Sequence, residues 1–252
     1  MTLKVLLLAG TAEGRAIAKG LSEMPGVSGM ASLAGAVRAP APLPIPTRIG
    51  GFGTAEGFAQ VLHAERIGLV VDATHPFAHR ISARSARVCA EQGIAYLQVL
   101  RPEWVAGPGD AWTMIRREED AAQHIAPGSC VFLATGRQTL GGFENLTGRR
   151  LICRQIDPPD DAFPFPGGEY LVGRPPFSVE DEIALFSRLN VDWLVVKNAG
   201  GAASRSKLDA ARALGMPVAM ITRPSPPDAE SVTTVEAALA RIKEHAWTNA
   251  SS

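Results

Sequence analysis

The feature that most constrains the fold is a repeated alternation of short aliphatic segments with amphipathic helical segments. Residues 3–9, LKVLLLA, form a near-continuous aliphatic run, which is typical of a parallel strand covered by helices on both faces. Over residues 12–24 apolar side chains recur at one-face helical spacing, and Pro25-Gly26 ends that element. The chain therefore begins with a strand–loop–helix unit.

The same alternation continues along the chain. In the first half we predict strands over residues 27–33, 47–49, 68–72 and 94–100, and helices over 54–66 and 77–92. A proline-dense stretch at residues 39–46 excludes both helix and central strand. In the second half we predict strands over 112–115, 130–134, 151–155, 193–197 and 218–222, and helices over 118–125, 178–189, 202–214 and 234–245.

This pattern predicts an α/β protein with two doubly wound Rossmann-like domains and largely parallel sheets. A chain of 252 residues suits two compact α/β units. The breaker cluster VAGPGD at residues 105–110 is predicted to link them. We expect a first domain over residues 1–105 and a second over residues 110–246.

The charge balance and cysteine content narrow the class of partner and compartment. Lys plus Arg and Asp plus Glu number 25 each, so nothing attracts the whole chain to nucleic acid or an anionic membrane. The three cysteines lack the spacing of a disulfide framework or a zinc site, and we expect no metal. The N-terminal apolar run is too short to span a bilayer and no signal-peptide cleavage pattern follows it, so we expect a cytoplasmic protein.

In doubly wound sheets, ligands bind beyond the carboxyl ends of the strands. The first strand leads into a glycine-flanked turn that opens a helix, where free backbone amides favour a phosphate. We predict cofactor contacts from this turn, which comprises Gly10, Thr11, Ala12, Glu13, Gly14 and Arg15. It is not a GxGxxG motif, and a tight turn that binds nothing would also need small residues.

The exit of the second strand bears on which nicotinamide nucleotide would bind. An acidic residue there accepts the ribose hydroxyl of NAD in Rossmann domains, but residues 32–38 contain neither Asp nor Glu. Ser32 and Arg38 stand there instead, and a hydroxyl near a guanidinium suits the 2′-phosphate of NADPH. Alternatively, Arg38 is a solvated loop charge.

The sequence DATHPFA at residues 72–78 crowds polar groups at the end of a buried strand. His75 precedes Pro76, which favours an extended backbone and would hold the imidazole at the strand tip. We predict His75 as a catalytic residue, with Asp72 and Thr74 contacting the cofactor. The alternative is an Asp–His hydrogen-bonded pair with a purely structural role.

Two loops in the second half place cations beside glycine backbone. We predict substrate contacts from Thr135, Gly136 and Arg137 after one strand, and from Asn198 and Gly200 after another. Lys197 ends an aliphatic strand and is predicted to be catalytic, with its ammonium facing the site. The alternative for Arg137 and Lys197 is a surface salt bridge of little consequence.

Five motifs in order, GTAEGR at 10–15, SLAG at 32–35, DATHPFA at 72–78, TGR at 135–137 and KNAGG at 197–201, resemble the precorrin-6A reductase family of cobalamin biosynthesis. The resemblance spans nearly the whole chain. It implies an oxidoreductase acting on a CH–CH bond, in which NADPH, without a flavin, reduces one double bond of the precorrin-6A macrocycle to give precorrin-6B. The reductase of the cobalt-bearing counterpart in the anaerobic route is an alternative.

Two departures from the family pattern concern the site. The family shows SLAGRT where this chain has SLAGAVRAP, which displaces the arginine to position 38 and puts its cofactor contact in doubt. Ala199 stands where the family often has serine. The resemblance otherwise implies a tetrapyrrole substrate, and other enzymes of the pathway are possible partners of a chain that we expect to be monomeric.

These residues suggest a mechanism and its rivals. We expect NADPH to lie over the first loop, with the second domain completing a shared crevice in which Arg137 and Lys197 meet substrate carboxylates. His75, Lys197 or water would deliver the proton. Rival functions are a different NADPH-dependent reductase or epimerase, and a module that senses NADPH without consuming it.

Overall fold

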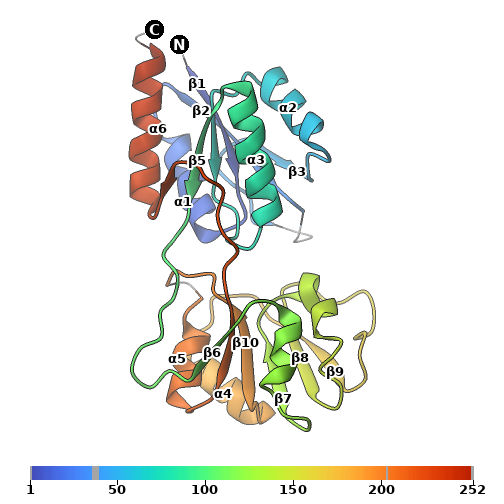
Figure 1. Ribbon diagram of the computed structural model, residues 1–252. Helices are drawn as coiled ribbons and strands as arrows, with labels where there is room; N and C mark the ends of the chain where they lie inside the picture. Colours follow the sequence, from blue (N-terminus) through green and yellow to red (C-terminus); the bar gives the residue numbers. More distant parts are fainter. Residues whose placement is uncertain (1, 36–39, 203, 251–252) are drawn as a thin grey trace. The chain divides into compact units, whose positions relative to one another are not determined.

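The computed structural model describes residues 2–35, 40–202 and 204–250, and it contains two compact units, each built around its own parallel sheet (Figure 1). The first unit comprises Met1–Pro102 and Pro224–Ser252, and the second comprises Glu103–Arg223. Each sheet has six strands, and every strand pair is parallel. The predicted α/β class with two doubly wound, Rossmann-like sheets is confirmed.

The first sheet has the strand order β12-β5-β4-β1-β2-β3. The chain runs outward from β1 to β3, crosses back to β4 and continues the other way, so the switch point lies between β1 and β4. Its elements are β1 (Leu3–Leu8), α1 (Ala12–Ser22), β2 (Val27–Leu33), β3 (Thr47–Ile49), α2 (Ala55–Ala64), β4 (Leu69–Asp72), α3 (His79–Gln92), β5 (Ala95–Val99), β12 (Ser231–Val232) and α6 (Val235–Ala250).

Both faces of the first sheet are covered by helices, as the aliphatic runs predict. Val5 and Leu7 of β1 belong to the core beneath α1 and α6, whereas Leu6 and Leu8 belong to the core beneath α2 and α3 (Figure 1). Each of these side chains is at most 2% exposed. Alternate residues of one strand thus stabilise two separate helical layers, which explains why the strand is apolar from Val5 to Leu8.

The second sheet repeats this plan with the order β6-β11-β10-β7-β8-β9. Its switch point lies between β7 and β10, so β7 corresponds to β1 and β10 to β4. Its elements are β6 (Trp112–Ile115), η1 (Glu118–Gln123), β7 (Cys130–Leu133), η2 (Arg137–Phe143), β8 (Arg150–Gln155), β9 (Gly168–Val172), α4 (Val179–Leu189), β10 (Trp193–Lys197), α5 (Ser206–Ala213) and β11 (Val218–Ile221).

The C-terminal segment departs from the expected division of the chain. Residues 110–246 were expected to form the second domain, but Pro224–Ser252 groups with the first unit. Ser231 and Val232 pair with β5 as the sixth strand of the first sheet, and α6 packs against α1 with Ala238 and Ile242 fully buried. The alternation of elements predicts the helix over 234–245 but not the two-residue strand β12, and it does not say which sheet either element joins.

Several local predictions also differ from the structure. The helix expected over residues 118–125 is the 3-10 helix η1, while η2 and the edge strand β9 were not predicted. The helix expected from residue 202 begins at Ser206. Glycines at 141 and 142 weaken the α-helical pattern in η2, and β9 is only partly buried, so its apolar pattern is faint.

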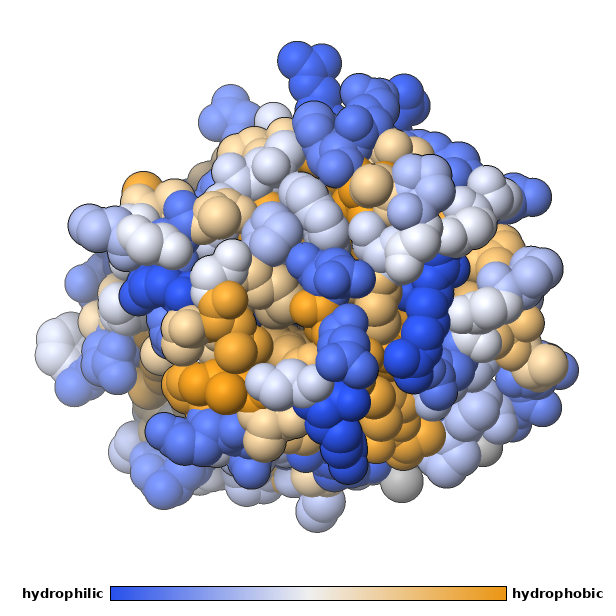
Figure 2. Space-filling model, turned by 90° about the horizontal axis from the view of Figure 1, so that it is seen from below, coloured by the Kyte–Doolittle hydropathy of each residue, from blue (hydrophilic) through white to orange (hydrophobic). Residues whose placement is uncertain are grey.

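The described surface is mixed in character. Figure 2 shows hydrophobic groups lying among hydrophilic ones on the face that it displays. Within the described ranges no helix is both long enough and apolar enough to cross a membrane. All three cysteines are buried and unpaired. The large hydrophobic side chains that are exposed come from separate elements, and they are Ile49, Val105, Met114, Val172, Leu214 and Trp247.

Candidate functional site

Thr11 joins the two loops that flank the switch point of the first unit. It is the N-cap of α1, and its Oγ1 accepts a hydrogen bond from the Gly14 amide at 3.1 Å. The same hydroxyl donates to the carbonyl of Ala73, after β4, at 2.8 Å. One side chain therefore fixes the start of α1 against the β4–α3 loop, and the predicted loop residues are brought together.

Gly10 and Gly14 keep the backbone of this turn close to β1 and open in front of it. Gly10 has a φ of +151°, and a Cβ built there would meet nothing within 4 Å among the described atoms. A Cβ on Gly14 would lie 3.3 Å from Ala9 and 3.4 Å from the carbonyl oxygen of Ala73. Gly14 thus permits close helix–strand packing, and Gly10 leaves the approach to the helix N-terminus clear.

The remaining residues of the turn differ in exposure. Glu13 forms an ion pair with Arg101, at 2.7 Å, and both side chains are largely buried at 23% and 15% exposure. Ala12 and Arg15 are exposed. Glu13 therefore anchors the first turn of α1 to the segment after β5, whereas Arg15 is available on the surface beside the turn.

Asp72 lies beneath the β4–α3 loop. It is 1% exposed, and its two carboxylate oxygens accept hydrogen bonds from the Thr74 amide at 2.9 Å and the Tyr96 hydroxyl at 2.6 Å. Burial and the Asp72 charge together raise the pKa of Tyr96, so that phenol stays protonated as a donor. Asp72 is therefore buried and holds the β4–α3 loop in place through Thr74.

Thr74 and His75 form the tip of the same loop. The Thr74 hydroxyl lies 3.5 Å from that of Ser82. His75 is exposed, and its Nδ1 accepts a hydrogen bond from the Phe77 amide at 3.3 Å. An Nδ1 that accepts leaves Nε2 as the protonated nitrogen of the neutral ring. The imidazole is therefore at the strand tip, where Pro76 was expected to hold it.

The end of β2 brings a hydroxyl and an arginine together. Ser32 is 5% exposed, and its register partner on β3 is Arg48, whose Nη1 lies 3.5 Å from the Ser32 hydroxyl. Arg38, the predicted phosphate contact, lies outside the described residues. Arg48 was missed because only the pairing of β2 with β3 places it next to Ser32.

Lys197 occupies the corresponding position at the end of β10 in the second unit. Its side chain is 14% exposed, and its Nζ donates to the Thr135 carbonyl at 3.3 Å and the Thr139 hydroxyl at 3.1 Å. Glu118 lies 3.7 Å away. Burial lowers the pKa of Lys197, and the Glu118 carboxylate opposes that shift.

Polar residues lie at or just beyond the ends of three neighbouring strands. Leu133 of β7 pairs with Cys153 of β8 and with Val195 of β10, and Thr135, Gln155 and Lys197 each come two residues later in the chain. Thr135 Oγ1 and both amide atoms of Gln155 are buried without a hydrogen-bond partner in the described part of the chain. Sequence reasoning missed Gln155, although a polar residue at the end of a buried strand is the signal that could have found it.

Arg137 and Gly136 lie at the start of η2. Gly136 has a φ of +76°, a value that favours glycine. Arg137 lies 3.8 Å from Asp160, and its side chain is 43% exposed. The guanidinium is therefore accessible to an anionic ligand, which would compete with a weak surface ion pair.

Asn198 does not have the open position that was expected of a substrate contact. It is 1% exposed, its Oδ1 accepts from the Trp104 amide at 2.9 Å, and its Nδ2 donates to the Trp104 carbonyl at 3.0 Å and to Glu103 at 3.2 Å. Gly200 has a φ of +68° in the turn that follows. The side-chain amide of Asn198 is thus engaged by the Trp104 backbone and by Glu103, and its contact with a substrate stays a prediction.

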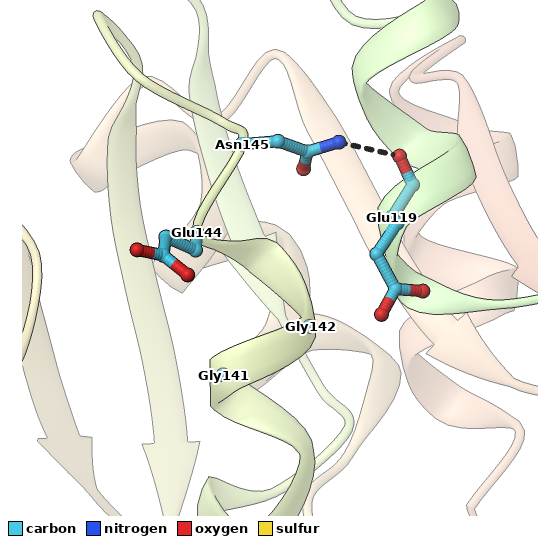
Figure 3. Close-up of a pocket in the computed structure, with 5 residues that line it drawn as sticks. All are labelled: Glu119, Gly141, Gly142, Glu144 and Asn145. Carbon is cyan, nitrogen blue, oxygen red and sulfur yellow. Dashed lines mark hydrogen bonds between the residues drawn. The ribbon is translucent and has the colours of Figure 1, made fainter.

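A cavity of about 300 Å³ lies between η1 and η2 and is lined by Glu119, Gly141, Gly142, Glu144 and Asn145. Figure 3 shows Asn145 donating to the carbonyl of Glu119, at 2.8 Å. Two carboxylates line this hollow, so it is electrostatically unsuited to a phosphate or an acid-rich ring. The strand-end loops are better candidates.

Comparison with known proteins identifies the family. Residues 4–243 match the family described as precorrin-6x reductase CbiJ/CobK. The chain belongs to this family. A precorrin-6A reductase from Rhodococcus erythropolis is 45% identical over 95% of this chain and 97% of the relative. The solved structure of CobK precorrin-6A reductase has a TM-score of 0.92 at 37% identity and covers 97% of each chain.

A more distant relative acts on the cobalt-bearing substrate according to its name. The cobalt-precorrin-6A reductase of Priestia megaterium is 29% identical over 87% of this chain and 90% of the relative. The chain is therefore more similar in sequence to the precorrin-6A reductase above than to this cobalt-precorrin-6A reductase.

Membership of a reductase family implies a nucleotide cofactor, and the first unit fits one. The backbone at Gly10 is clear, Gly14 packs tightly against β1, and Thr11 caps the start of α1, so the chemistry of this turn fits a phosphate group. Its place at the switch point of the sheet is where such folds bind dinucleotides. No group of three or more His, Cys, Asp or Glu suited to a metal is present in residues 2–35, 40–202 and 204–250.

Proposed function

We propose that the protein is an NADPH-dependent precorrin-6A reductase of cobalamin biosynthesis, which saturates one double bond of the macrocycle to give precorrin-6B. The observation that carries this proposal is the match of 45% identity over 95% of the chain to a precorrin-6A reductase. The open glycine turn at the switch point of the first unit supports it independently.

The first unit is the cofactor domain in this proposal. NADPH supplies a hydride when bound. The turn from Gly10 to Arg15 receives the pyrophosphate, and Thr11 keeps that turn in register with the β4–α3 loop. The described exit of β2 offers Ser32 and no carboxylate, which favours a 2′-phosphate over a free ribose hydroxyl.

The second unit supplies substrate contacts. Arg137 is exposed enough to meet a carboxylate of the acid-rich ring, and Thr135 and Lys197 line the end of the sheet beside it. Carboxylates bound near Lys197 would favour its charged form. The proton that completes the reduction comes from His75, Lys197 or water, and His75 is exposed at its loop tip.

The cobalt-precorrin-6A reductase activity of the anaerobic route is the second candidate. It is favoured less because the cobalt-precorrin relative is 29% identical whereas the precorrin-6A relative is 45% identical.

Three unpaired cysteines suit a reducing compartment, and we propose that the protein acts in the cytoplasm.

The test is incubation of the full chain with NADPH and either precorrin-6A or its cobalt-bearing counterpart, in parallel with NADH. We expect the nicotinamide absorbance to fall and the product to gain two hydrogens with NADPH and precorrin-6A. Turnover only with the cobalt macrocycle would assign the anaerobic route. Binding of NADPH without turnover of either macrocycle would favour a sensing module.

A further inference from the structure

We propose that Arg48 and Arg84, which both contact the ring of Phe52, bind the 2′-phosphate of the cofactor and select NADPH over NADH. The inference rests on the proposed function, because it concerns the same cofactor site. It adds two residues that the five motifs do not contain, and it assigns them a phosphate rather than a structural role.

Arg48 lies beside the end of β2, where the 2′-phosphate of NADPH is expected. It stands on β3 opposite Ser32 of β2, and its guanidinium carbon lies 4.1 Å from the centre of the Phe52 ring. Its polar contacts are long: 3.5 Å to the Ser32 hydroxyl, 3.4 Å to the Gly50 carbonyl and 3.5 Å to the Gly51 carbonyl. Such long contacts are weak, so the guanidinium retains hydrogen-bonding capacity.

Arg84 reaches the same aromatic group from α3. Its guanidinium carbon lies 5.7 Å from the Phe52 ring and 5.2 Å from the Phe58 ring. Its Nε is buried and has no hydrogen-bond partner in the described part of the protein. Burial lowers the pKa of Arg84. A buried donor without an acceptor destabilises the protein unless a ligand or water satisfies it.

The electrostatics of the pair favour an anion. Neither Arg48 nor Arg84 has a carboxylate within ion-pair distance among the described residues. Two cations that contact one ring repel each other in a partly desolvated setting. A phosphate dianion would reverse that repulsion and could accept from both guanidinium forks.

The place of the pair in the fold identifies which phosphate this would be. In a doubly wound sheet the pyrophosphate lies at the first loop, and the adenosine ribose lies at the end of the second strand. Ser32 lies near the end of the second strand, β2, and Arg48 is its register partner on β3. The 2′-phosphate is the feature that distinguishes NADPH from NADH at this position, so these arginines act as selectivity residues.

Titration of the full-length protein with NADP⁺ and NAD⁺ tests the proposal without the substrate. The two ligands differ only in the 2′-phosphate. We expect the wild type to bind NADP⁺ more tightly, and we expect Arg48→Ala and Arg84→Ala each to weaken NADP⁺ binding roughly 10- to 100-fold. NAD⁺ affinity should change little. With precorrin-6A, KM for NADPH should rise in the same ratio while kcat is kept.

Arg87→Ala is the matched control, because it removes an exposed arginine from the same helix, where it pairs with Glu91 at 2.6 Å. It should keep the wild-type preference. Arg48→Lys and Arg84→Lys keep the positive charge but lose the paired N–H donors of the guanidinium, so they should retain part of the preference for NADP⁺. They keep the test open if an alanine variant fails to fold. Circular dichroism and thermal melting verify folding.

The outcomes separate this inference from the proposed function. If the wild type prefers NADP⁺ and both alanine variants keep that preference, the assignment of Arg48 and Arg84 is wrong while the NADPH proposal stands. If Arg38→Ala loses the preference for NADP⁺ while Arg48→Ala and Arg84→Ala keep it, the assignment is also wrong, and Arg38 is the selectivity residue. If the wild type shows no preference, the choice of NADPH itself fails.

Discussion

Asn198 holds the backbone of Trp104 through both atoms of its side-chain amide, at 2.9 Å to the amide and 3.0 Å to the carbonyl. The indole Nε1 of Trp104 adds a hydrogen bond to the Gly201 carbonyl at 2.7 Å. The first residues of the second unit are thereby fixed to the loop after β10. The loop that follows Lys197 is thus held by the first residues of the same unit.

Asn198→Ala should therefore act on stability first. Removing the amide leaves the Trp104 backbone groups buried without partners, and we expect a loss of about 2–4 kcal/mol in unfolding free energy. Chemical denaturation measures it. Asn145→Ala, at an exposed asparagine with one hydrogen bond, should cost less than about 1 kcal/mol. Equal effects of the two substitutions would contradict this account of Asn198.

Thr11→Ala should weaken both the fold and cofactor binding. It removes the cap of α1 and the bond to Ala73, and we expect a loss of about 1–2 kcal/mol in stability together with lower NADP⁺ affinity. Thr11→Ser should keep both properties. Thr234→Ala is the control. It removes the hydroxyl that caps α6 by accepting a hydrogen bond from the Ala237 amide at 3.1 Å. That variant should lose stability only, and an equal loss of NADP⁺ affinity there would exclude a specific role for Thr11.

The ion pair of Lys197 with Glu118 should set the alkaline limit of activity. Glu118→Gln removes the carboxylate that opposes the effect of burial, so the pKa of Lys197 falls further. If the charged lysine binds substrate, kcat/KM should then decline at lower pH than in the wild type. Glu119→Gln, which removes the neighbouring carboxylate on η1, should leave the profile in place. An unchanged limit in Glu118→Gln would argue against a charged Lys197.

Lys207 should impose a pH dependence on stability that has no part in the chemistry. Burial, followed by the nearby Arg154, lowers its pKa to about 8. Between pH 8 and about pH 10.4 the unfolded chain therefore binds more protons than the native one, so stability rises with pH over that interval. The gain is on the order of 3 kcal/mol. It should disappear from denaturation curves of Lys207→Met, and persistence in that variant would assign it to other groups.

The fold was predictable from sequence wherever strands are buried on both faces. The run from Leu3 to Ala9 allows one interpretation because all its side chains except that of Lys4 are apolar. β12 could not be found, since two residues, Ser231 and Val232, carry no periodicity and owe their pairing to β5 alone. The position of α6 depends in the same way on tertiary packing against α1.

The sequence indicated that the site residues lie at the ends of strands. It did not indicate which partner each side chain contacts. Thr11 and Gly14 lie where the loop pattern indicates, because local chemistry decides an N-cap and a close approach. The backbone contacts of Asn198 could not be foreseen, because a polar residue after a strand has the same sequence signal whether it faces a ligand or backbone. Arg48 became visible only through the register of β3 against β2.

The most direct measurement is transfer of label from cofactor to macrocycle. The protein is incubated with precorrin-6A and NADPH that carries deuterium at the transferable position, and the product is analysed by mass spectrometry. We expect each reduced macrocycle to carry one deuterium from the cofactor and one hydrogen from solvent. Unlabelled product, or labelled NADPH left unconsumed beside intact precorrin-6A, would contradict it.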